Sequence, residues 1–472
     1  MRFLAPLALL MALISPVHAQ EKEPAKPLNI VLITADDMNW DSLGCTGSTV
    51  PNITPHLDQL AKEGMLFRQA HATVTVCQPV RATMHTGLYT LNNGCTGFGP
   101  IREDVRTINE VMDEHGYLIS MLAKTPHYEP FEKWCVDYKV HARDLDVGRN
   151  PEKFRLHTRK FLKMAAEQDK PFFHHVNCQD PHRPFSWSGE EVIKGREGTY
   201  PPVTREIQPE EVEIPGFLEQ LPAIRQEVAD YYTCVHRLDQ CVGVVMDELK
   251  AAGHDQDTLV VFFGGDHGMA FPFAKSNAYD ASSRAALILR WPDVIPANQV
   301  DDEHLVATID LAPTLLEAAG LPAIEGIDGR SFLAIAKGEK QKGWERVFTM
   351  YHETFSKRQL QMRCVRTKDK AYIWNAWSDG KQTYRAENMS GMTWKAMLMA
   401  AETHPEIRER CDFYLYRTPE EYYITSDDPN ERRNLIDDPK HQEDIAAMKK
   451  EVEKLLVKMN DPLLGEFRKL MK

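Results

Sequence analysis

The apolar run at residues 28–37, LNIVLITADD, is the feature that most constrains the fold of this 472-residue chain. Hydrophobic residues dominate the run with little polar alternation, and it ends at two aspartates. A continuous apolar run of this length is typical of a strand that is buried on both faces, as in a parallel sheet. The sequence therefore predicts a sheet with covering elements on both sides.

Helix-like and apolar segments alternate after this run. Thr54 is a suitable N-cap residue, Pro55 occupies the first helical position and Gly64 can end the helix. The same succession of helix, turn and apolar strand recurs at residues 108–124, 160–180 and 239–268, and another helix is expected to end at Gly320. This alternation predicts an α/β fold, a large, mainly parallel sheet sandwiched by helices, with ligand sites at the carboxyl ends of its strands.

The character of the sequence changes near residue 345. The segment RCVRTKDKAYIWNAW has the pattern of an antiparallel hairpin, and a charged helix is expected at the C-terminus. We therefore expect a main domain over residues 27–345. A smaller α+β subdomain over residues 346–472 would hold a small antiparallel sheet and a terminal helix.

The N-terminus has the pattern of a secretory signal peptide over residues 1–19. Arg2 gives a short positive region, residues 3–14 are apolar, and Val17–His18–Ala19 fits a small-residue cleavage site. The apolar run is too short to span a membrane comfortably. We therefore expect an exported protein, periplasmic or secreted, that is not embedded in a membrane. The net charge of −13 argues against general nucleic-acid binding.

Acidic residues follow two of the expected strands. Asp36 and Asp37 end the first run, and Asp266 and His267 follow the strand LVVFFGG. Carboxylates that gather at strand ends repel one another, and a hard cation such as Ca²⁺ relieves that repulsion. A solvated turn or a helix cap is the alternative interpretation of each pair.

The segment VCQPVRATMHTG, residues 76–87, joins a cysteine to an arginine four positions later. Pro79 favours the first turn of a helix, on which Cys77 and Arg81 would share one face. A helix N-terminus beside an arginine suits a tetrahedral oxyanion. A core cysteine near a surface arginine is the simpler alternative.

Further basic or titratable residues lie soon after expected strands: Lys124, His127, His182 and Lys275. Taken singly, each has the character of a surface residue. Together they would give a site at the strand ends a positively charged surface. Such a surface suits negative charge that develops on an ester and proton delivery to a leaving group.

Taken in order, these motifs resemble the sulfatase family of the alkaline phosphatase superfamily. The resemblance begins at PLNIVLITADDMNWDSLG and continues through TPHLDQLAKEGMLFRQAHA, CQPVRATMHTGLY, GYLISMLAK, DPHRPF, FFGGDHG and AKSNAYD to YYITSDDPNERRNL. It covers nearly the whole chain that would remain after removal of the leader. It implies an alkaline-phosphatase-like fold and a sulfatase catalytic domain over residues 27–345.

The resemblance also implies a role for the cysteine. In sulfatases the cysteine of Cys-x-Pro-x-Arg is oxidised to formylglycine by a maturation enzyme that reads the proline and the arginine. The aldehyde hydrates, one hydroxyl attacks sulfur and the other later helps to expel sulfate. Cys77 would thus be the precursor of formylglycine, and Arg81 would support the modified residue.

The remaining site roles are implied in the same way. One Ca²⁺ ion would be bound by Asp36, Asp37, Asp266, His267 and modified Cys77. Lys124 and Lys275 would hold the sulfate oxygens, His127 would assist the formylglycine hydroxyl, and His182 would protonate the leaving group. Two positions depart from the common pattern: His267 stands where many relatives have asparagine, and the spacing from Lys124 to His127 is one residue longer than Lys-x-His.

The segment QDPHRPF is most similar to the branch of the family that acts on N-sulfoglucosamine. This similarity implies a sulfated carbohydrate substrate and exo-action on heparin- or heparan-type saccharides, with Arg183, Arg102 and His85 as candidate sugar contacts. An O-sulfatase acting on another glycan is one alternative, and a phosphodiester or phosphonate hydrolase of the same superfamily is another. A non-catalytic glycan-binding protein on this fold is a third.

Overall fold

A computed structural model describes residues 27–185 and 200–472 of the chain. The predicted signal peptide, residues 1–19, lies outside the described residues. Among the described residues, no helix combines the length and the apolar character that crossing a membrane requires.

Within the described residues, nine strands form one large sheet in the order β4-β3-β5-β1-β6-β7-β2-β8, with β9 paired to β2. The strands β4, β3, β5, β1 and β6 run parallel to one another, which confirms the prediction of a mainly parallel sheet. The strands are β1 (Asn29–Thr34), β2 (Met65–His71), β3 (Leu118–Leu122), β4 (Tyr138–Val140), β5 (Phe172–Asn177), β6 (Thr258–Gly264), β7 (Arg284–Arg290), β8 (Gln299–Asp301) and β9 (Val306–Ala307).

Strand β1 shows why the apolar run is continuous. Ile30 and Leu32 belong to one apolar core, and Val31 and Ile33 belong to another. Because successive side chains of a strand point to opposite faces, these two cores lie on the two sides of the sheet. The first run therefore needs apolar residues at every position.

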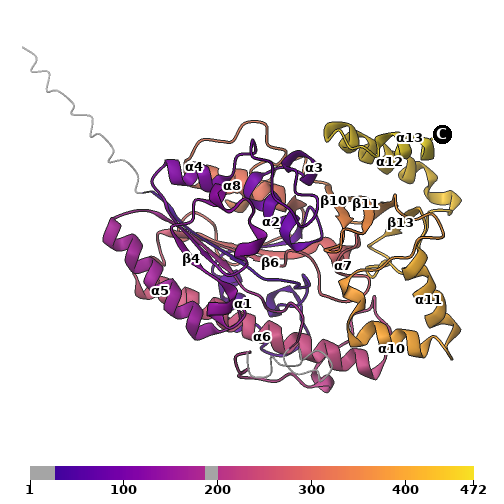
Figure 1. Cartoon of the computed structure of the whole chain (residues 1–472), viewed down its shortest axis with the longest axis horizontal. Helices are drawn as coiled ribbons and strands as arrows, with labels where there is room; N and C mark the ends of the chain where they lie inside the picture. Colours follow the sequence, from indigo (N-terminus) through magenta and orange to yellow (C-terminus); the bar gives the residue numbers. More distant parts are fainter. Residues whose placement is uncertain (1–26, 186–199) are drawn as a thin grey trace, which may run out of the picture.

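Helices cover both faces of the sheet (Figure 1). One layer contains α2, α3, α4 and α8, and the other contains α1, α5 and α6. Their bounds are α1 (Pro55–Lys62), α2 (Cys77–Thr86), α3 (Thr90–Asn93), α4 (Ile108–Glu114), α5 (Pro151–Gln168), α6 (Pro222–Ala251) and α8 (Leu311–Ala318). Helix α1 begins at Pro55 as predicted, although Thr54 Oγ1 donates to Asp58 rather than capping the first turn.

The connection from β6 to β7 stays at the end of the sheet where β6 finishes. Residues 265–283 turn back through the short helix α7 (Asp280–Ser283), and β7 then runs antiparallel to β6. A crossover helix would have returned the chain to the opposite end of the strands, and β7 would then run parallel to β6. The loop consequently remains at the carboxyl end of β6, where it brings Lys275 to the site described below.

The C-terminal part contains the predicted antiparallel sheet. Its strand order is β10-β11-β12-β13, and the hairpin expected at RCVRTKDKAYIWNAW forms β11 and β12. The elements are β10 (Val347–Glu353), β11 (Gln359–Arg366), β12 (Lys370–Asn375), β13 (Glu420–Ile424), α10 (Met392–Ala400), α11 (Pro405–Tyr416), α12 (Gln442–Lys458) and α13 (Leu464–Leu470), and α9 (Leu333–Ala336) comes just before them in the chain.

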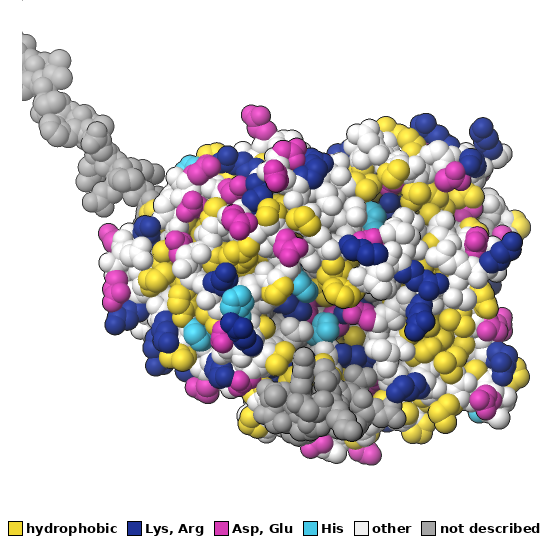
Figure 2. Space-filling view, in the orientation of Figure 1, with side chains coloured by type: hydrophobic (Ala, Val, Ile, Leu, Met, Phe, Trp, Pro, Cys, Tyr) yellow, Lys and Arg dark blue, Asp and Glu magenta, His cyan; other side chains and the backbone are white. Residues whose placement is uncertain are grey.

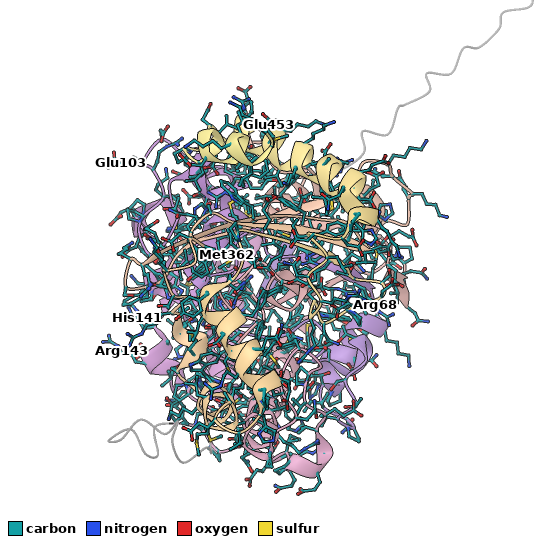
Figure 3. The ribbon with its side chains drawn as sticks, turned by 90° about the vertical axis from the view of Figure 1, so that its right-hand side faces the viewer. Arg68, Glu103, His141, Arg143, Met362 and Glu453 are labelled. Atoms are coloured by element: carbon teal, nitrogen blue, oxygen red, sulfur yellow. The ribbon has the colours of Figure 1, made fainter. Side chains whose placement is uncertain are left out.

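Figure 3 views the molecule from the side of this second sheet. Met362 of β11 lies inside, and Glu453 lies on α12 at the outer edge. Met362 shares one continuous apolar core with Ile30 and Leu32 of the large sheet. The two sheets are thus packed together, and the proposed boundary near residue 345 stays a prediction.

Candidate active site

Three carboxylates converge where β1 and β6 end side by side. Strands β1 and β6 are hydrogen-bonded neighbours, and Asp36, Asp37 and Asp266 have no solvent exposure. Asp37 has a φ of 61°, and Gly265 has a φ of 117°. These left-handed conformations redirect the chain as it leaves each strand, and the backbone N–H of Asp37 donates to Asp266 Oδ1 at 3.2 Å.

Cys77 and Arg81 approach this cluster from helix α2. The helix begins at Cys77, as predicted, and every residue of it is buried. Arg81 Nη2 donates to Asp36 Oδ1 at 3.1 Å and to Asp266 Oδ2 at 3.5 Å. Its other terminal nitrogen donates to Thr34, Tyr128 and Asn177. Arg81 therefore ties the helix to two strand ends instead of lying at the surface.

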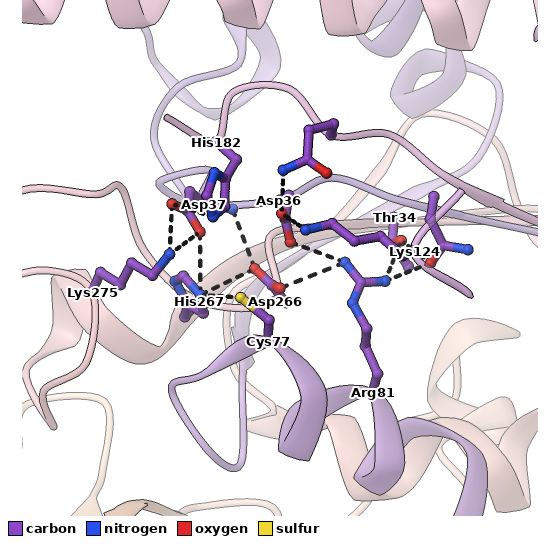
Figure 4. Close-up of polar contacts among 12 residues, drawn as sticks. Thr34, Asp36, Asp37, Cys77, Arg81, Lys124, His182, Asp266, His267 and Lys275 are labelled. Carbon is purple, nitrogen blue, oxygen red and sulfur yellow. Dashed lines mark hydrogen bonds and ion pairs between the residues drawn. The ribbon is translucent and has the colours of Figure 1, made fainter. Parts of the chain in front are cut away.

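Two lysines lie on opposite sides of the cluster (Figure 4). Lys124, which follows β3 and has a φ of 50°, forms an ion pair with Asp36. Lys275 donates to the two carboxylate oxygens of Asp37 at 2.9 and 2.8 Å, and it also pairs with Glu387. Each lysine thus neutralises one of the first pair of aspartates.

His267 turns one ring nitrogen into the cluster. Its Nδ1 lies 3.0 Å from the carbonyl oxygen of Gly268, which assigns the ring proton to Nδ1. The other ring nitrogen, Nε2, faces Asp37 Oδ1 at 3.2 Å, Asp266 Oδ1 at 3.4 Å and Cys77 Sγ at 3.4 Å. In the neutral tautomer with its proton on Nδ1, His267 would turn the lone pair of Nε2 toward these carboxylates and the thiol, an arrangement suited to a cation.

The two other histidines predicted for the site lie nearby. His182 Nε2 is 3.8 Å from Asp37 Oδ2, and its Nδ1 bonds to the carbonyl of Arg183. His127 lies in the 3-10 turn Thr125–His127 directly after Lys124. Its Nδ1 has no hydrogen-bond partner among the described residues. The predicted role of His127 beside modified Cys77 stays a prediction.

Burial and charge shift the pKa values of this cluster in opposite directions. Burial, together with the charge of Asp36, raises the pKa of Asp266 to about 6. Burial also opposes ionisation of Asp36, but Lys124, a hydrogen bond to Asp266, His182 and Arg81 hold its pKa well below the usual value. Burial, and secondarily Asp266, raises the pKa of the Cys77 thiol well above its usual value.

The donors present fit a bound divalent cation. One ligand atom from each of Asp37, Cys77, Asp266 and His267 lies within 4.8 Å of the others, and Asp36, Asp37, Cys77 and His182 form a second such group. Burial first, and then the charge of Asp36, raise the pKa of Asp266, and a cation between these carboxylates would relieve their repulsion. The carboxylate oxygens suit a hard cation such as Ca²⁺, and His267 adds a nitrogen donor.

The structure corrects the predicted sugar contact at His85. His85 has no solvent exposure, and its Nδ1 bonds to Asn109 at 2.7 Å. Its ring packs against His175, Tyr128 and Trp134. His85 is a core residue on the inner side of α2, where a sugar cannot reach it.

Arg102 and Arg183, the two arginines predicted to contact sugar, both pair with protein carboxylates. Arg102 is exposed and pairs with Asp104. Both residues line a separate cavity together with Pro322 and Ile327. Arg183 is buried, and its Nη2 lies 2.5 Å from Glu227 of α6. Glu227 also accepts from the backbone at the start of α10. Each arginine thus has a protein carboxylate as partner, and its predicted contact with a sugar stays a prediction.

Two polar residues of the site had no distinctive sequence signal. Gln179 Nε2 donates to Asp36 Oδ2 at 3.3 Å, and Glu387 reaches Lys275 from the C-terminal part of the chain. Gln179 follows an expected strand and could have been considered on that ground. Glu387 lies in a segment whose position depends on packing between distant parts of the chain.

Comparisons with known proteins agree with this geometry. The sequence model named Sulfatase matches residues 28–321, and the model named N-sulphoglucosamine sulphohydrolase, C-terminal, matches residues 265–384. The chain is 30% identical to human N-sulphoglucosamine sulphohydrolase over 93% of this chain and 91% of the relative. It is 25% identical to an ulvan-active sulfatase of Formosa agariphila over 93% of this chain and 76% of the relative.

A solved 2-O glycosaminoglycan sulfatase shares the fold, with a TM-score of 0.67 and 18% sequence identity. The match covers 92% of this chain and 93% of the solved one. The family match spans more than half of the chain and includes every element that brings the carboxylates, Cys77 and the lysines together. The chain therefore belongs to the sulfatase family, whose members hydrolyse sulfate esters and sulfamates.

Proposed function

We propose that this protein is a formylglycine-dependent, calcium-dependent sulfatase that removes sulfate from the end of heparin- or heparan-type saccharides, with N-sulfoglucosamine as the favoured target. One observation carries the proposal: Cys77, at the start of α2, faces buried carboxylates and His267, with Lys124 and Lys275 on either side. The similarity to the human enzyme and to the C-terminal sequence model supports the choice of sugar.

The environment of Cys77 supports conversion of its thiol. A cysteine that works as a nucleophile has a lowered pKa, whereas burial and Asp266 raise the pKa of Cys77. Formylglycine derived from Cys77 would supply a hydrated aldehyde oxygen as the nucleophile. Because Cys77 and Arg81 are buried, the maturation enzyme would need to read the segment before the fold closes.

The charged side chains would orient the sulfate. Asp36, Asp37, Asp266 and His267 would hold Ca²⁺ together with modified Cys77, and the ion would polarise a sulfate oxygen. The ammonium groups of Lys124 and Lys275 would contact the other sulfate oxygens, because both extend to the same carboxylate cluster from opposite sides (Figure 4). Fixed positive charge in a buried site stabilises negative charge that develops during the reaction.

His182 would deliver the proton to the leaving group. Its Nδ1 is held by the carbonyl of Arg183, and its Nε2 is directed to the side of the cluster where Asp37 lies. Burial lowers the pKa of His182 from its usual value. A histidinium of lowered pKa releases its proton more readily, which favours transfer to an amine or an alcohol. His127 would assist the attacking hydroxyl from the turn after Lys124.

Exo-action and export complete the proposal. A chain with a net charge of −13 and two buried lysines that converge on a small site fits the end of a polyanion better than its length. The leader over residues 1–19 supports a periplasmic or secreted enzyme. Release of a mature chain that begins at Gln20 would be the expected product of processing.

The test is sulfate release from defined glycosaminoglycan saccharides by protein made in a host that forms formylglycine, with Cys77→Ala as the control. Release from N-sulfoglucosamine alone is the expected result. Release from an O-sulfated sugar would keep the mechanism and replace the substrate. Release of phosphate without sulfate, dependent on Mn²⁺ or Zn²⁺, would overturn the proposal in favour of a phosphodiester or phosphonate hydrolase.

A further inference from the structure

A cavity of about 600 Å³ lies next to the carboxylate cluster. Its wall includes Val76 and Ser276, the chain neighbours of Cys77 and Lys275, as well as Glu387, which pairs with Lys275. In Figure 2, histidine and acidic side chains are visible in a hollow near the middle of the face. Lys and Arg side chains gather beside it over the C-terminal part. A space of this size can hold more than one sulfate group.

Two arginines of the C-terminal part line this cavity. Arg358 is half-buried, and its Nη2 donates to the carbonyl of Thr383 at 2.6 Å. Arg385 is exposed. Within the described ranges, 27–185 and 200–472, neither guanidinium has a carboxylate partner. Two unneutralised arginines on one cavity wall stand out in a chain with a net charge of −13.

An aromatic pair forms another part of the wall. Phe355 is 75% exposed. Its ring centroid is 5.0 Å from that of Phe98, in an edge-to-face arrangement, and both rings line the cavity. Exposed aromatic rings at the mouth of a cavity present a flat apolar surface to a ligand that also carries polar groups.

We propose that this cavity is a subsite in which Arg385 and Arg358 bind a second anionic group of the saccharide, while the sulfate to be removed lies between Lys124 and Lys275. The inference rests on the proposed function and defines its substrate further. The ligand is a sulfated saccharide with at least two negative charges. The second charge is either the carboxylate of an adjoining uronic acid or a second sulfate on the same sugar.

The chemistry of the wall favours such a ligand over a neutral one. Guanidinium groups bind carboxylate and sulfate oxygens through paired N–H donors. Glu387 would repel an anion, and Lys275, which is shared between the carboxylates of Asp37 and Glu387, offsets that charge only in part. The two guanidinium groups together outweigh the one carboxylate of Glu387. The phenylalanines can pack on the apolar face of the sugar ring while the arginines bind its charged substituent.

Three substrates and three variants test this inference. The substrates are the methyl glycoside of N-sulfoglucosamine, the same glycoside with an added 6-O-sulfate, and N-sulfoglucosamine linked to a uronic acid. The variants are Arg385→Gln, Arg358→Gln and, as a matched control, Arg408→Gln, an exposed arginine on α11 that does not line the cavity. The values of kcat/KM are compared between the singly and doubly charged substrates.

We expect wild-type protein to prefer at least one doubly charged substrate. Arg385→Gln should lower kcat/KM for that substrate by about ten- to a hundredfold and for the singly charged glycoside by less than about threefold. Arg358→Gln should act in the same direction, and Arg408→Gln should change neither value. The preferred substrate identifies the second group as a carboxylate or as a sulfate. Equal losses for all substrates, or no loss in Arg385→Gln, would overturn the inference.

A binding measurement separates this inference from the proposed function. The Cys77→Ala protein and its double variant with Arg385→Gln are titrated with the same saccharides by calorimetry. If converted wild-type protein releases sulfate from none of them, the proposed function fails and binding alone decides the inference. Tighter binding of a doubly charged saccharide that is lost with Arg385 supports the subsite, and equal binding of singly and doubly charged saccharides refutes it.

Discussion

The sulfur of Cys77 lies 3.4 Å from Nε2 of His267, although 190 positions separate the two residues in the chain. Helix α2 begins at Cys77, and His267 follows β6 by three residues. Since His267 Nε2 also faces Asp37 and Asp266, residue 77 and the strand-end acids form a single site. Any oxygen that replaces the sulfur of Cys77 would thus lie beside the carboxylates proposed to hold Ca²⁺.

Replacing Asp266 by asparagine should weaken calcium binding and should leave the metal-free protein at least as stable as wild type. The pKa of Asp266 is raised to about 6 by burial and by Asp36, so an amide there removes repulsion between two close carboxylates. Without calcium, Asp266→Asn should melt at the same temperature as wild type or higher. Calcium at a hundred times its Kd should stabilise wild type by about 2.7 kcal/mol and the variant by much less, as measured by thermal unfolding.

Asp310→Asn is the matched control for this experiment. Asp310 is also buried, and burial raises its pKa to about 6. Its carboxylate accepts from the backbone of Ala307 and Arg330, away from the strand-end cluster. Calcium should stabilise this variant as much as wild type. Equal calcium stabilisation of Asp266→Asn and wild type would place the ion elsewhere.

His182→Gln should slow turnover in proportion to how much the leaving group needs a proton. With an amine or sugar hydroxyl as leaving group, kcat should fall by roughly 10²- to 10⁴-fold. With 4-nitrophenyl sulfate, whose leaving group departs as an anion, the fall should be less than about tenfold. Steady-state kinetics on both substrates make the comparison, with the exposed His404→Gln as control. The same loss on both would assign His182 to binding instead.

The part of the site that could be predicted from sequence is the part held by the buried strands. Continuous apolar runs indicate strands covered on both faces, and parallel strands bring their carboxyl ends to one edge. Asp36, Asp37, Asp266 and His267 follow directly from that rule. Cys77 and Arg81 follow from a helix start, because positions four apart share one face of a helix.

The other parts of the site depend on tertiary packing, which no local sequence pattern indicates. Glu387 reaches Lys275 only because the C-terminal sheet shares its core with the large sheet. His85 lies one turn beyond Arg81 on the same helix and was expected at a sugar. However, α2 is buried on every side, and His85 faces the core. Spacing on a helix indicates which residues share a face, but it does not indicate what that face meets.

Buried neutral histidines should make the protein sensitive to acid. His174 is fully buried between the hydroxyl groups of Ser120 and Thr158, and burial lowers its pKa from 6.5 to about 3. The unfolded chain takes up a proton that the folded chain excludes. The contribution of His174 to stability is therefore fully present above pH 6.5 and is lost as the pH falls toward 3. Each such group changes the free energy of unfolding by up to about 1.4 kcal/mol per pH unit.

The variant His174→Gln should reduce this dependence on pH. Urea unfolding at several pH values between 6.5 and 4 should give a shallower loss of stability for the variant than for wild type. The exposed His115→Gln should keep the wild-type slope. Parallel curves for His174→Gln and wild type would mean that His174 is protonated in the folded protein.

Replacing Phe355 by alanine should weaken binding of saccharides without destabilising the fold. The side chain is 75% exposed, so its removal should change the free energy of unfolding by less than about 0.5 kcal/mol. Its ring faces the cavity beside Phe98, and loss of an aromatic contact with a sugar should raise KM by roughly three- to tenfold. Because the ring carries no charge, singly and doubly charged saccharides should be affected alike, in contrast to Arg385→Gln. Phe355→Trp should retain the wild-type KM, whereas an unchanged KM in Phe355→Ala would remove this ring from the subsite.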